Sequence, residues 1–206
     1  MEQVSIMIVG VGGQGTLLAS RLLGAALLSS GCGYDVKVSE VHGMSQRGGS
    51  VVTYVKFGER VASPIIDLGE ADVILAFEQL EAARWLPYLK PEGKVIVNTQ
   101  RIDPMPVITG AAEYPQGIVE HLRAAGVAVQ AIDALALAME SGSAKAVNVV
   151  LLGALAKQLL RSSELADATG VSPGIPRGTW EEAVRSTVKP QFAEMNLKAF
   201  ALGWAA

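Results

Sequence analysis

Residues 4–15 read VSIMIVGVGGQG, and this stretch decides the fold. Residues 4–9 form a short run rich in β-branched side chains, which is typical of a buried strand. The glycines of residues 10–15 predict a tight turn. Apolar residues at helical spacing over 16–30 predict a helix, which the glycines at positions 31 and 33 stop. The order strand, glycine turn, helix is the opening unit of a Rossmann-like α/β domain.

The rest of the chain continues this alternation. Further strands are predicted at 34–41, 50–57, 72–77, 94–98 and 127–132, and further helices at 78–86, 116–125, 134–139, 144–160 and 179–204. Such a pattern gives a mostly parallel sheet with helices on both faces. We therefore expect one three-layer α/β domain over residues 1–206, with a C-terminal helical arm over about residues 179–206 that is interrupted at Pro190.

The second and third strands are separated by too few residues for a crossover helix. We expect this pair to run antiparallel, so that the sheet is mixed. The segment between these two strands then leaves the carboxyl end of the second strand, at the same sheet edge as the glycine turn. In open α/β sheets this edge is where ligands bind.

The composition excludes some classes of protein. Hydrophobic residues make up 50% of the chain and charged residues 18%, which excludes intrinsic disorder. With 17 basic and 20 acidic residues the net charge is −3, so nucleic-acid binding is not expected, because phosphate recognition needs an excess of Lys and Arg. The apolar content favours a permanent protein partner, although a sheet buried on both faces also raises it.

The single cysteine limits the redox chemistry. An iron–sulfur cluster needs about four thiolates, and a structural zinc ion about four Cys or His ligands. The chain offers Cys32, His42 and His121 without a metal-ligand spacing. We expect no metal site, so any redox centre is an organic cofactor or lies on another chain. The absence of a basic signal region and of an apolar run near ~20 residues predicts a cytoplasmic protein that does not enter membranes.

The turn Gly10-Val11-Gly12-Gly13-Gln14-Gly15 matches G-x-G-x-x-G between a strand and a helix. Its glycines allow close approach of a phosphate, and the helix start presents free N–H groups. A dinucleotide site also needs an acid at the end of the second strand, where Glu40 stands. Three interpretations stay open at this point: a dinucleotide, another anion, or a turn that binds nothing.

Three other chemistries are unsupported. Thr16 and Leu17 follow the turn where a phosphate-binding P-loop needs Lys and then Ser or Thr. The chain contains no Gly-Asp-Gly sequence for thiamine diphosphate. The sequence Gly43-Met44-Ser45-Gln46-Arg47 has arginine where a nucleophile elbow needs glycine, so a serine hydrolase is not indicated.

The segment after the second strand is the other functional candidate. Besides Glu40 it contains His42, Met44, Ser45, Gln46, Arg47, Gly48 and Gly49. A simple connector rarely needs an imidazole, an amide and a guanidinium together, and Arg47 suits a planar anion such as a carboxylate or phosphate. The alternative is a solvated turn in which Arg47 pairs with Glu40. Asn98, at the end of a strand, and Asn148, on the apolar helix, are weaker candidates, because such amides also bond to nearby backbone.

The glycine turn together with the sequence SEVHGMSQRGGSV at residues 39–51 resembles the gamma-type subunits of 2-oxoacid:ferredoxin oxidoreductases, and most closely the branch that acts on indolepyruvate. The resemblance covers most of the chain and is weakest beyond Leu160. It implies a subunit without tightly bound cofactors, whose large catalytic partner carries thiamine diphosphate, Mg²⁺ and [4Fe–4S] clusters. It also implies coenzyme A as cosubstrate, ferredoxin as acceptor, and a hetero-oligomer, with a homodimer as the alternative for the isolated chain.

Two other functions compete with this expectation. The first is a self-contained Rossmann oxidoreductase that binds NAD(P) or a flavin at the glycine turn. The second is a non-enzymatic module that senses a nucleotide. The resemblance places residues 40–49 at the partner interface or active centre, and the glycine turn becomes an accessory phosphate site, with coenzyme A as the candidate ligand.

Overall fold

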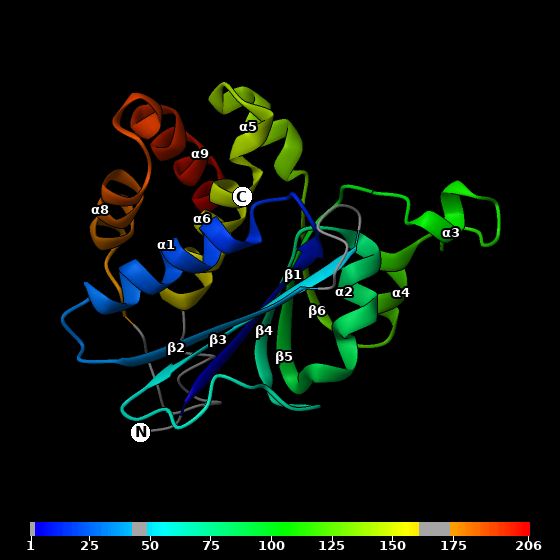
Figure 1. Ribbon diagram of the computed structural model, residues 1–206, viewed down its shortest axis with the longest axis horizontal. Coiled ribbons are helices and arrows are strands. Elements are labelled where there is room, and N and C mark those ends of the chain that lie inside the picture. The colour runs from blue at the N-terminus through cyan, green and yellow to red at the C-terminus, as the bar shows by residue number, and fades with distance from the viewer. Residues whose placement is uncertain (1–2, 43–48, 161–173) are drawn as a thin grey trace.

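The sheet contains six strands in the order β2-β3-β1-β4-β5-β6 (Figure 1). The computed structural model describes residues 3–42, 49–160 and 174–206. The strands are β1 (Val4–Val11), β2 (Asp35–His42), β3 (Ser50–Gly58), β4 (Ala71–Ala76), β5 (Leu89–Asn98) and β6 (Ala128–Ile132). They agree with the expected strands, except that β5 begins at Leu89 instead of Lys94.

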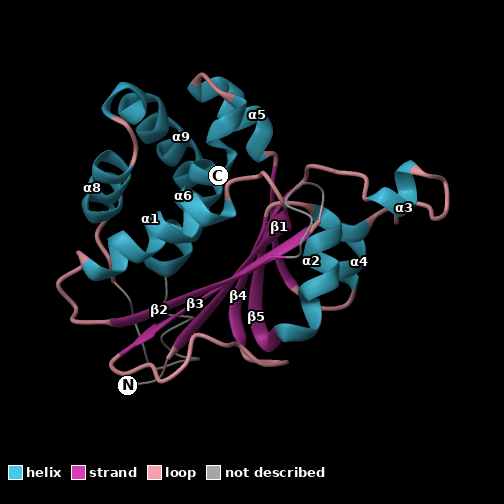
Figure 2. Ribbon diagram, viewed as in Figure 1, coloured by secondary structure: helices cyan, strands magenta, loops and turns pink. Residues whose placement is uncertain are grey.

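Helices cover both faces of the sheet, which gives the expected three-layer α/β arrangement (Figure 2). One face carries α1 (Thr16–Leu28) and α6 (Val147–Leu160), with α5 (Ala134–Ser141), α8 (Arg177–Thr187) and α9 (Ala193–Ala205) packed against them. The other face carries α2 (Gln79–Trp85) and α4 (Ile118–Ala124), and the short α3 (Met105–Ile108) projects from the body (Figure 1). Short 3₁₀ turns are η1 (Leu86–Tyr88), η2 (Ala144–Ala146) and η3 (Pro190–Phe192).

In the described sheet, β3 is the strand that runs against the others. It lies between β1 and β2 and pairs antiparallel with both, so that Val51 faces Gly10 on one side and His42 on the other. The pairs β1–β4, β4–β5 and β5–β6 are parallel. The expected antiparallel pairing of the second and third strands is confirmed. The carboxyl ends of β1 and β2 therefore lie at the same edge of the sheet.

The sheet separates two apolar cores. Ile8 and Leu75 point toward α1 and α6, whereas Met7 and Ile74 point toward α2 and α4. All of β4 is buried, as its apolar sequence predicts for a central strand. Helix α6 is buried on nearly every side, which confirms the prediction of a central helix from its apolar sequence.

Two glycines bring α6 and α9 into backbone contact. A Cβ atom on Gly203 would lie 1.8 Å from the Val150 carbonyl oxygen, and a Cβ on Gly153 would lie 2.2 Å from the Phe200 carbonyl oxygen. The C-terminal helices are thus packed into the domain. They begin at Arg177 and are interrupted at η3, which starts at the expected break, Pro190.

The described residues contain no group of three or more His, Cys, Asp or Glu side chains placed to hold a metal ion. Cys32 is exposed, in the turn after α1. None of the helices in the described ranges is long and apolar enough to cross a membrane.

Candidate functional site at the carboxyl edge of the sheet

The glycine turn at residues 10–15 joins β1 to α1 at the carboxyl edge. Gly13 and Gly15 have φ angles of 100° and 85°, in the left-handed region that favours glycine. Gly10 is required for space, because a Cβ there would lie 2.9 Å from both Gln14 Oε1 and Phe77 Cβ. The sequence pattern at the turn thus has a local structural cause at each of these three glycines.

Gln14 ties the turn to the neighbouring parallel strand. Its Oε1 accepts a hydrogen bond from the Val11 N–H at 2.8 Å, and its Nε2 donates to the Phe77 carbonyl at 3.0 Å. Val11 ends β1 and Phe77 follows β4, so the side chain bridges these two strands. The chain connections run outward in opposite directions from this pair, and ligands of open α/β sheets bind at such a crevice. The Gln14 amide occupies part of it.

Asn98 and Asn148 also lie at this edge. Asn98 is fully buried; its Nδ2 donates to the Phe77 carbonyl at 3.1 Å, and its Oδ1 accepts from the Ala134 N–H at 3.1 Å. Asn148 is buried on α6 and donates to the Gly15 carbonyl at 3.4 Å. Both amides bond to backbone, and they connect the ends of β4 and β5, the start of α5 and the glycine turn.

The predicted loop between β2 and β3 starts and ends beside the turn. Glu40 is exposed on β2, and the Gly49 carbonyl accepts a hydrogen bond from the Gly12 N–H at 2.9 Å. Residues 43–48 lie outside the described residues, and so does the side chain of His42. The structure thus brings Gly49 into contact with the glycine turn and places Glu40 two strands away, across a cavity that both line. Met44, Ser45, Gln46, Arg47 and Gly48 stay predictions from the sequence.

A carboxylate that the sequence analysis missed anchors the exit of this loop. Glu81 is buried in α2 and accepts hydrogen bonds from Ser50 Oγ, from Trp85 Nε1 at 3.2 Å and from Arg84 Nε at 3.1 Å. Ser50 is the first residue of β3. The loop exit is therefore held by α2 as well as by the glycine turn.

Glu78 is a second buried carboxylate that was missed. It follows β4, and its oxygens accept hydrogen bonds from the Glu81 N–H at 3.0 Å and the Ile102 N–H at 3.2 Å. The Tyr114 hydroxyl also donates to it, and burial together with this bond raises the pKa of Tyr114. These contacts fix the base of the segment that carries α3. The available signal was position, since an acid directly after a buried strand lies at the ligand edge.

Two cavities flank the glycine turn. One, of about 420 Å³, lies between the turn, the start of α1, Glu40 and Val51. The other, of about 450 Å³, lies between the turn, Gln100 and Lys145. No side chain caps α1, so its first N–H groups are not used by a cap. Backbone N–H groups, an amide and an ammonium group at the second cavity form a set of donors suited to an anion.

The chain is similar to known proteins over nearly its whole length. Residues 5–206 match the family described as pyruvate ferredoxin/flavodoxin oxidoreductase. The chain is 44% identical to the indolepyruvate oxidoreductase subunit IorB of Thermococcus kodakarensis, over 98% of this chain and 95% of the relative. It is 37% identical to the protein of the same name from Archaeoglobus fulgidus, over 98% of this chain and 94% of the relative.

Solved structures share the fold. The gamma subunit of a keto/oxoacid ferredoxin oxidoreductase from Geobacter sulfurreducens has a TM-score of 0.66 at 22% identity, over 98% of this chain and 96% of that one. The 2-oxoglutarate:ferredoxin oxidoreductase from Magnetococcus marinus, solved with 2-oxoglutarate, coenzyme A and succinyl-CoA bound, has a TM-score of 0.68 at 21% identity; the match covers 100% of this chain and 31% of that one. The sequence matches confirm the resemblance seen in residues 10–15 and 39–51, and the chain belongs to the pyruvate ferredoxin/flavodoxin oxidoreductase family.

Proposed function

We propose that the chain is the small subunit of a 2-oxoacid:ferredoxin oxidoreductase whose substrate is indolepyruvate or another aryl pyruvate. The observation that carries the proposal is the near-complete match to subunits named for indolepyruvate. In this reaction the 2-oxoacid loses CO₂, its acyl group passes to coenzyme A, and two electrons pass one at a time to oxidised ferredoxin.

In this proposal the large partner subunit holds the cofactors. Thiamine diphosphate with Mg²⁺ supplies the carbanion chemistry, and [4Fe–4S] clusters carry the electrons. The one cysteine of this chain cannot ligate such a cluster, and the carboxylates of the sheet edge, Glu78 and Glu81, already bond to protein donors. The small subunit contributes orientation and electrostatics, and the isolated chain has no turnover.

The loop over residues 42–49 is proposed to contact the large subunit near its active centre. Its support is that both ends are anchored: β2 pairs with β3 up to His42, Gly49 bonds to Gly12, and Ser50 bonds to Glu81. Arg47 then recognises an anionic group on the 2-oxoacid, the cofactor or coenzyme A.

The glycine turn is proposed as an accessory site for a phosphate of coenzyme A. Its support is the 450 Å³ cavity, where the turn and the uncapped start of α1 lie near the ammonium group of Lys145. The first turn of a helix and a lysine both favour a phosphate dianion over a neutral group.

The competing dinucleotide function is disfavoured by the strand order. In a dinucleotide-binding sheet, the acid that binds the ribose ends the strand beside β1. Here β3 lies between β1 and β2, so Glu40 stands two strands from the turn. At ~4.8 Å per strand this separation is about 10 Å, roughly twice that of the dinucleotide arrangement.

The test combines the chain with its large subunit, thiamine diphosphate, coenzyme A and an oxidised viologen, and follows viologen reduction by an aryl pyruvate. We expect turnover by the complex and none by either subunit alone. Arg47→Ala should assemble normally and lose about tenfold or more in turnover, which corresponds to ~1.4 kcal/mol in the barrier. Arg123→Ala, an exposed arginine on α4, is the matched control and should change neither quantity.

Two results would contradict the proposal. Turnover by the purified chain alone would show a complete catalytic set within it. Tight, saturable binding of NAD(P) or a flavin by the isolated chain would support the Rossmann alternative. Normal turnover of an assembled Arg47→Ala complex would remove Arg47 from the mechanism and leave the subunit assignment in place.

A further inference from the structure

A cavity of about 570 Å³ opens where α1, the start of α6 and the junction of α8 with α9 meet. We refer to it as the α8–α9 cavity. Its apolar walls are formed by Leu18, Val188, Phe192 and Met195. Phe192 leaves 44% of its surface exposed, although large apolar side chains are usually covered. The volume and the mainly apolar lining are those of a site for a small organic molecule.

The charged residues that line this cavity are all positive. Lys145 and Lys189 belong to its lining, and both are exposed. Among the described residues, neither ammonium group has a hydrogen-bond or ion-pair partner, and the lining contains no Asp or Glu. Asn196 donates to the Phe192 carbonyl at 2.8 Å, which fixes the backbone of this wall. An apolar pocket with two unpaired cations is complementary to an apolar anion.

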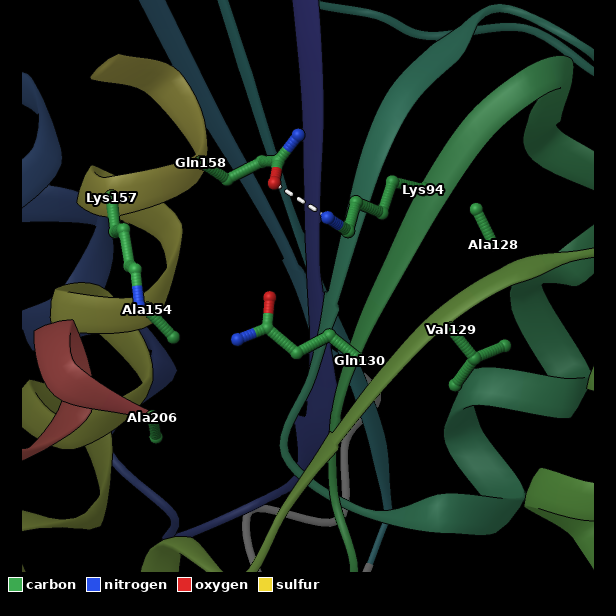
Figure 3. Close-up of a pocket in the computed structure, with 8 residues that line it drawn as sticks. All are labelled: Lys94, Ala128, Val129, Gln130, Ala154, Lys157, Gln158 and Ala206. Atoms are coloured by element: carbon green, nitrogen blue, oxygen red, sulfur yellow. Dashed lines mark hydrogen bonds between the residues drawn. The ribbon is translucent and has the colours of Figure 1, made fainter. Parts of the chain in front are cut away.

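Another lysine-lined cavity provides the contrast. It has a volume of about 490 Å³ and lies between β5, β6, α6 and the C-terminus (Figure 3). There Lys94 Nζ donates to Gln158 Oε1 at 2.5 Å, and Lys157 Nζ donates to the Ala205 carbonyl at 3.3 Å. These two cations are held by protein acceptors. The α8–α9 cavity differs because its lysines have no such acceptors and its walls are apolar.

We propose that the α8–α9 cavity binds a small carboxylate with an aromatic body. The carboxylate meets the ammonium groups of Lys145 and Lys189, and the aromatic body packs against Phe192 and Met195. Aromatic rings pack favourably on phenylalanine and on methionine sulfur. The proposed function does not use the α8–α9 cavity, although Lys145 also lines the 450 Å³ cavity at the glycine turn, whereas Lys189 lines only the α8–α9 cavity of the two. The inference concerns residues of this chain alone, so it holds or fails independently of the large subunit.

The test titrates the full chain with 2-naphthylacetate and with the neutral 2-naphthylacetamide by calorimetry. The acid should bind about tenfold or more tightly than the amide, since only the acid meets the two cations. With methyl-¹³C-methionine, the acid should shift the Met195 signal, while Met105 on α3 keeps its position. Equal affinity of acid and amide, or a shift at Met105 without one at Met195, overturns the proposal.

Lysine variants test whether Lys145 and Lys189 bind the carboxylate. The double variant Lys145→Met, Lys189→Met keeps the apolar stems and should weaken binding of the acid by about tenfold or more, with little effect on binding of the amide. Lys189→Met alone should also weaken binding of the acid, and because Lys189 does not line the 450 Å³ cavity, this variant assigns the effect to the α8–α9 cavity. Lys157→Met, in the contrasting cavity, should bind both probes like the unchanged protein. No binding of the acid, together with self-association that Phe192→Glu abolishes, would assign the cavity to a second copy of the chain and overturn the proposal.

Discussion

The α6–α9 crossing and the carboxyl edge of the sheet are stabilised in opposite ways. At the crossing, Gly153 and Gly203 allow backbone to touch backbone. At the edge, the buried polar side chains Glu78 and Asn98 and the half-buried Gln14 bond to segments distant in sequence. The crossing therefore depends on volume, whereas the edge depends on satisfied polar groups. Substitutions in the two regions should therefore differ in how much they lower the free energy of unfolding and in how that loss depends on pH.

The largest effect is expected from Gly203→Ala at the crossing. The added Cβ would lie 1.8 Å from the Val150 carbonyl oxygen, and real Cβ atoms essentially never approach within 3.0 Å. The neighbour is backbone and not the end of a flexible side chain, so the two helices must shift relative to each other. Overpacking usually destabilises a protein by about 1–3 kcal/mol, and a contact with rigid backbone belongs at the upper end of that range. We therefore expect the free energy of unfolding to fall by about 3 kcal/mol or more. Urea denaturation measures this change.

Gly24→Ala is the matched control for this substitution. Gly24 lies in the interior of α1, and a Cβ there would have no heavy atom within 4 Å. Alanine is a better helix former than glycine, so this variant should gain about 0.5–1 kcal/mol. A loss at Gly203 no larger than the change at Gly24 would contradict the backbone contact between α6 and α9.

The two regions also differ in what the sequence could predict. The apolar run at 144–160 predicted a central helix covered on several sides, and the structure confirms it as α6 (Val147–Leu160), which is buried on nearly every side. It did not predict that α9 is the partner, or that Gly153 meets Phe200, because periodicity within a helix contains no information about register between helices. The strands, the antiparallel β2–β3 pair and the break at Pro190 were accessible because each is a local signal.

At the carboxyl edge, local motifs were visible and long-range contacts were not. The glycine turn and the loop after β2 were identified from residue types at close spacing. Glu81 and Glu78 were missed because their partners, Ser50 and Tyr114, lie 31 and 36 residues away. A lone acid in a sequence gives no sign of which distant donor it meets.

Tyr114→Phe should produce the next largest effect, at the polar edge. The variant removes a hydrogen bond to the buried carboxylate of Glu78, which keeps its two backbone N–H donors. Loss of a hydrogen bond to a charged group costs about 1.5–3 kcal/mol. Chemical denaturation at neutral pH measures this loss. Tyr88→Phe is the control, since the Tyr88 hydroxyl has no hydrogen-bond partner among the described residues.

The same variant should change the alkaline limb of the stability curve. Burial, followed by the bond to Glu78, raises the pKa of Tyr114 in the folded protein above its ordinary value of 10.0. The protonated Tyr114 hydroxyl therefore stabilises the folded state fully below pH 10.0, the ordinary tyrosine pKa. This stabilisation is lost as the pH rises from there toward the folded-state pKa, with a slope of at most ~1.4 kcal/mol per pH unit. Wild type and Tyr114→Phe should converge as the pH rises above 10. A constant difference between them would contradict the assigned bond.

Gln14→Ala should have the smallest effect of the three. The Val11 N–H loses its side-chain acceptor, whereas the Phe77 carbonyl still receives the Asn98 amide. Because Gln14 lines the open 450 Å³ cavity, water can reach the freed groups, and we expect a loss of only about 1 kcal/mol. Gln191→Ala, at an exposed position of η3, is the control and should be neutral.

Gln14→Glu separates the two halves of the bridge. Either carboxylate oxygen can accept from the Val11 N–H, but the other then faces the Phe77 carbonyl oxygen, to which the native Nε2 donates at 3.0 Å. Two acceptors in contact repel, so at pH 7 this variant should be less stable than Gln14→Ala. Near pH 4 a protonated carboxyl can donate to the Phe77 carbonyl. At that pH Gln14→Glu should therefore be more stable than Gln14→Ala, the reverse of their order at pH 7. Gly203 meets only backbone atoms of Val150, which do not titrate, so Gly203→Ala should show no comparable dependence on pH. If Gln14→Glu were as stable as the wild type at both pH values, the Gln14 amide would not bridge β1 and β4 at the carboxyl edge of the sheet.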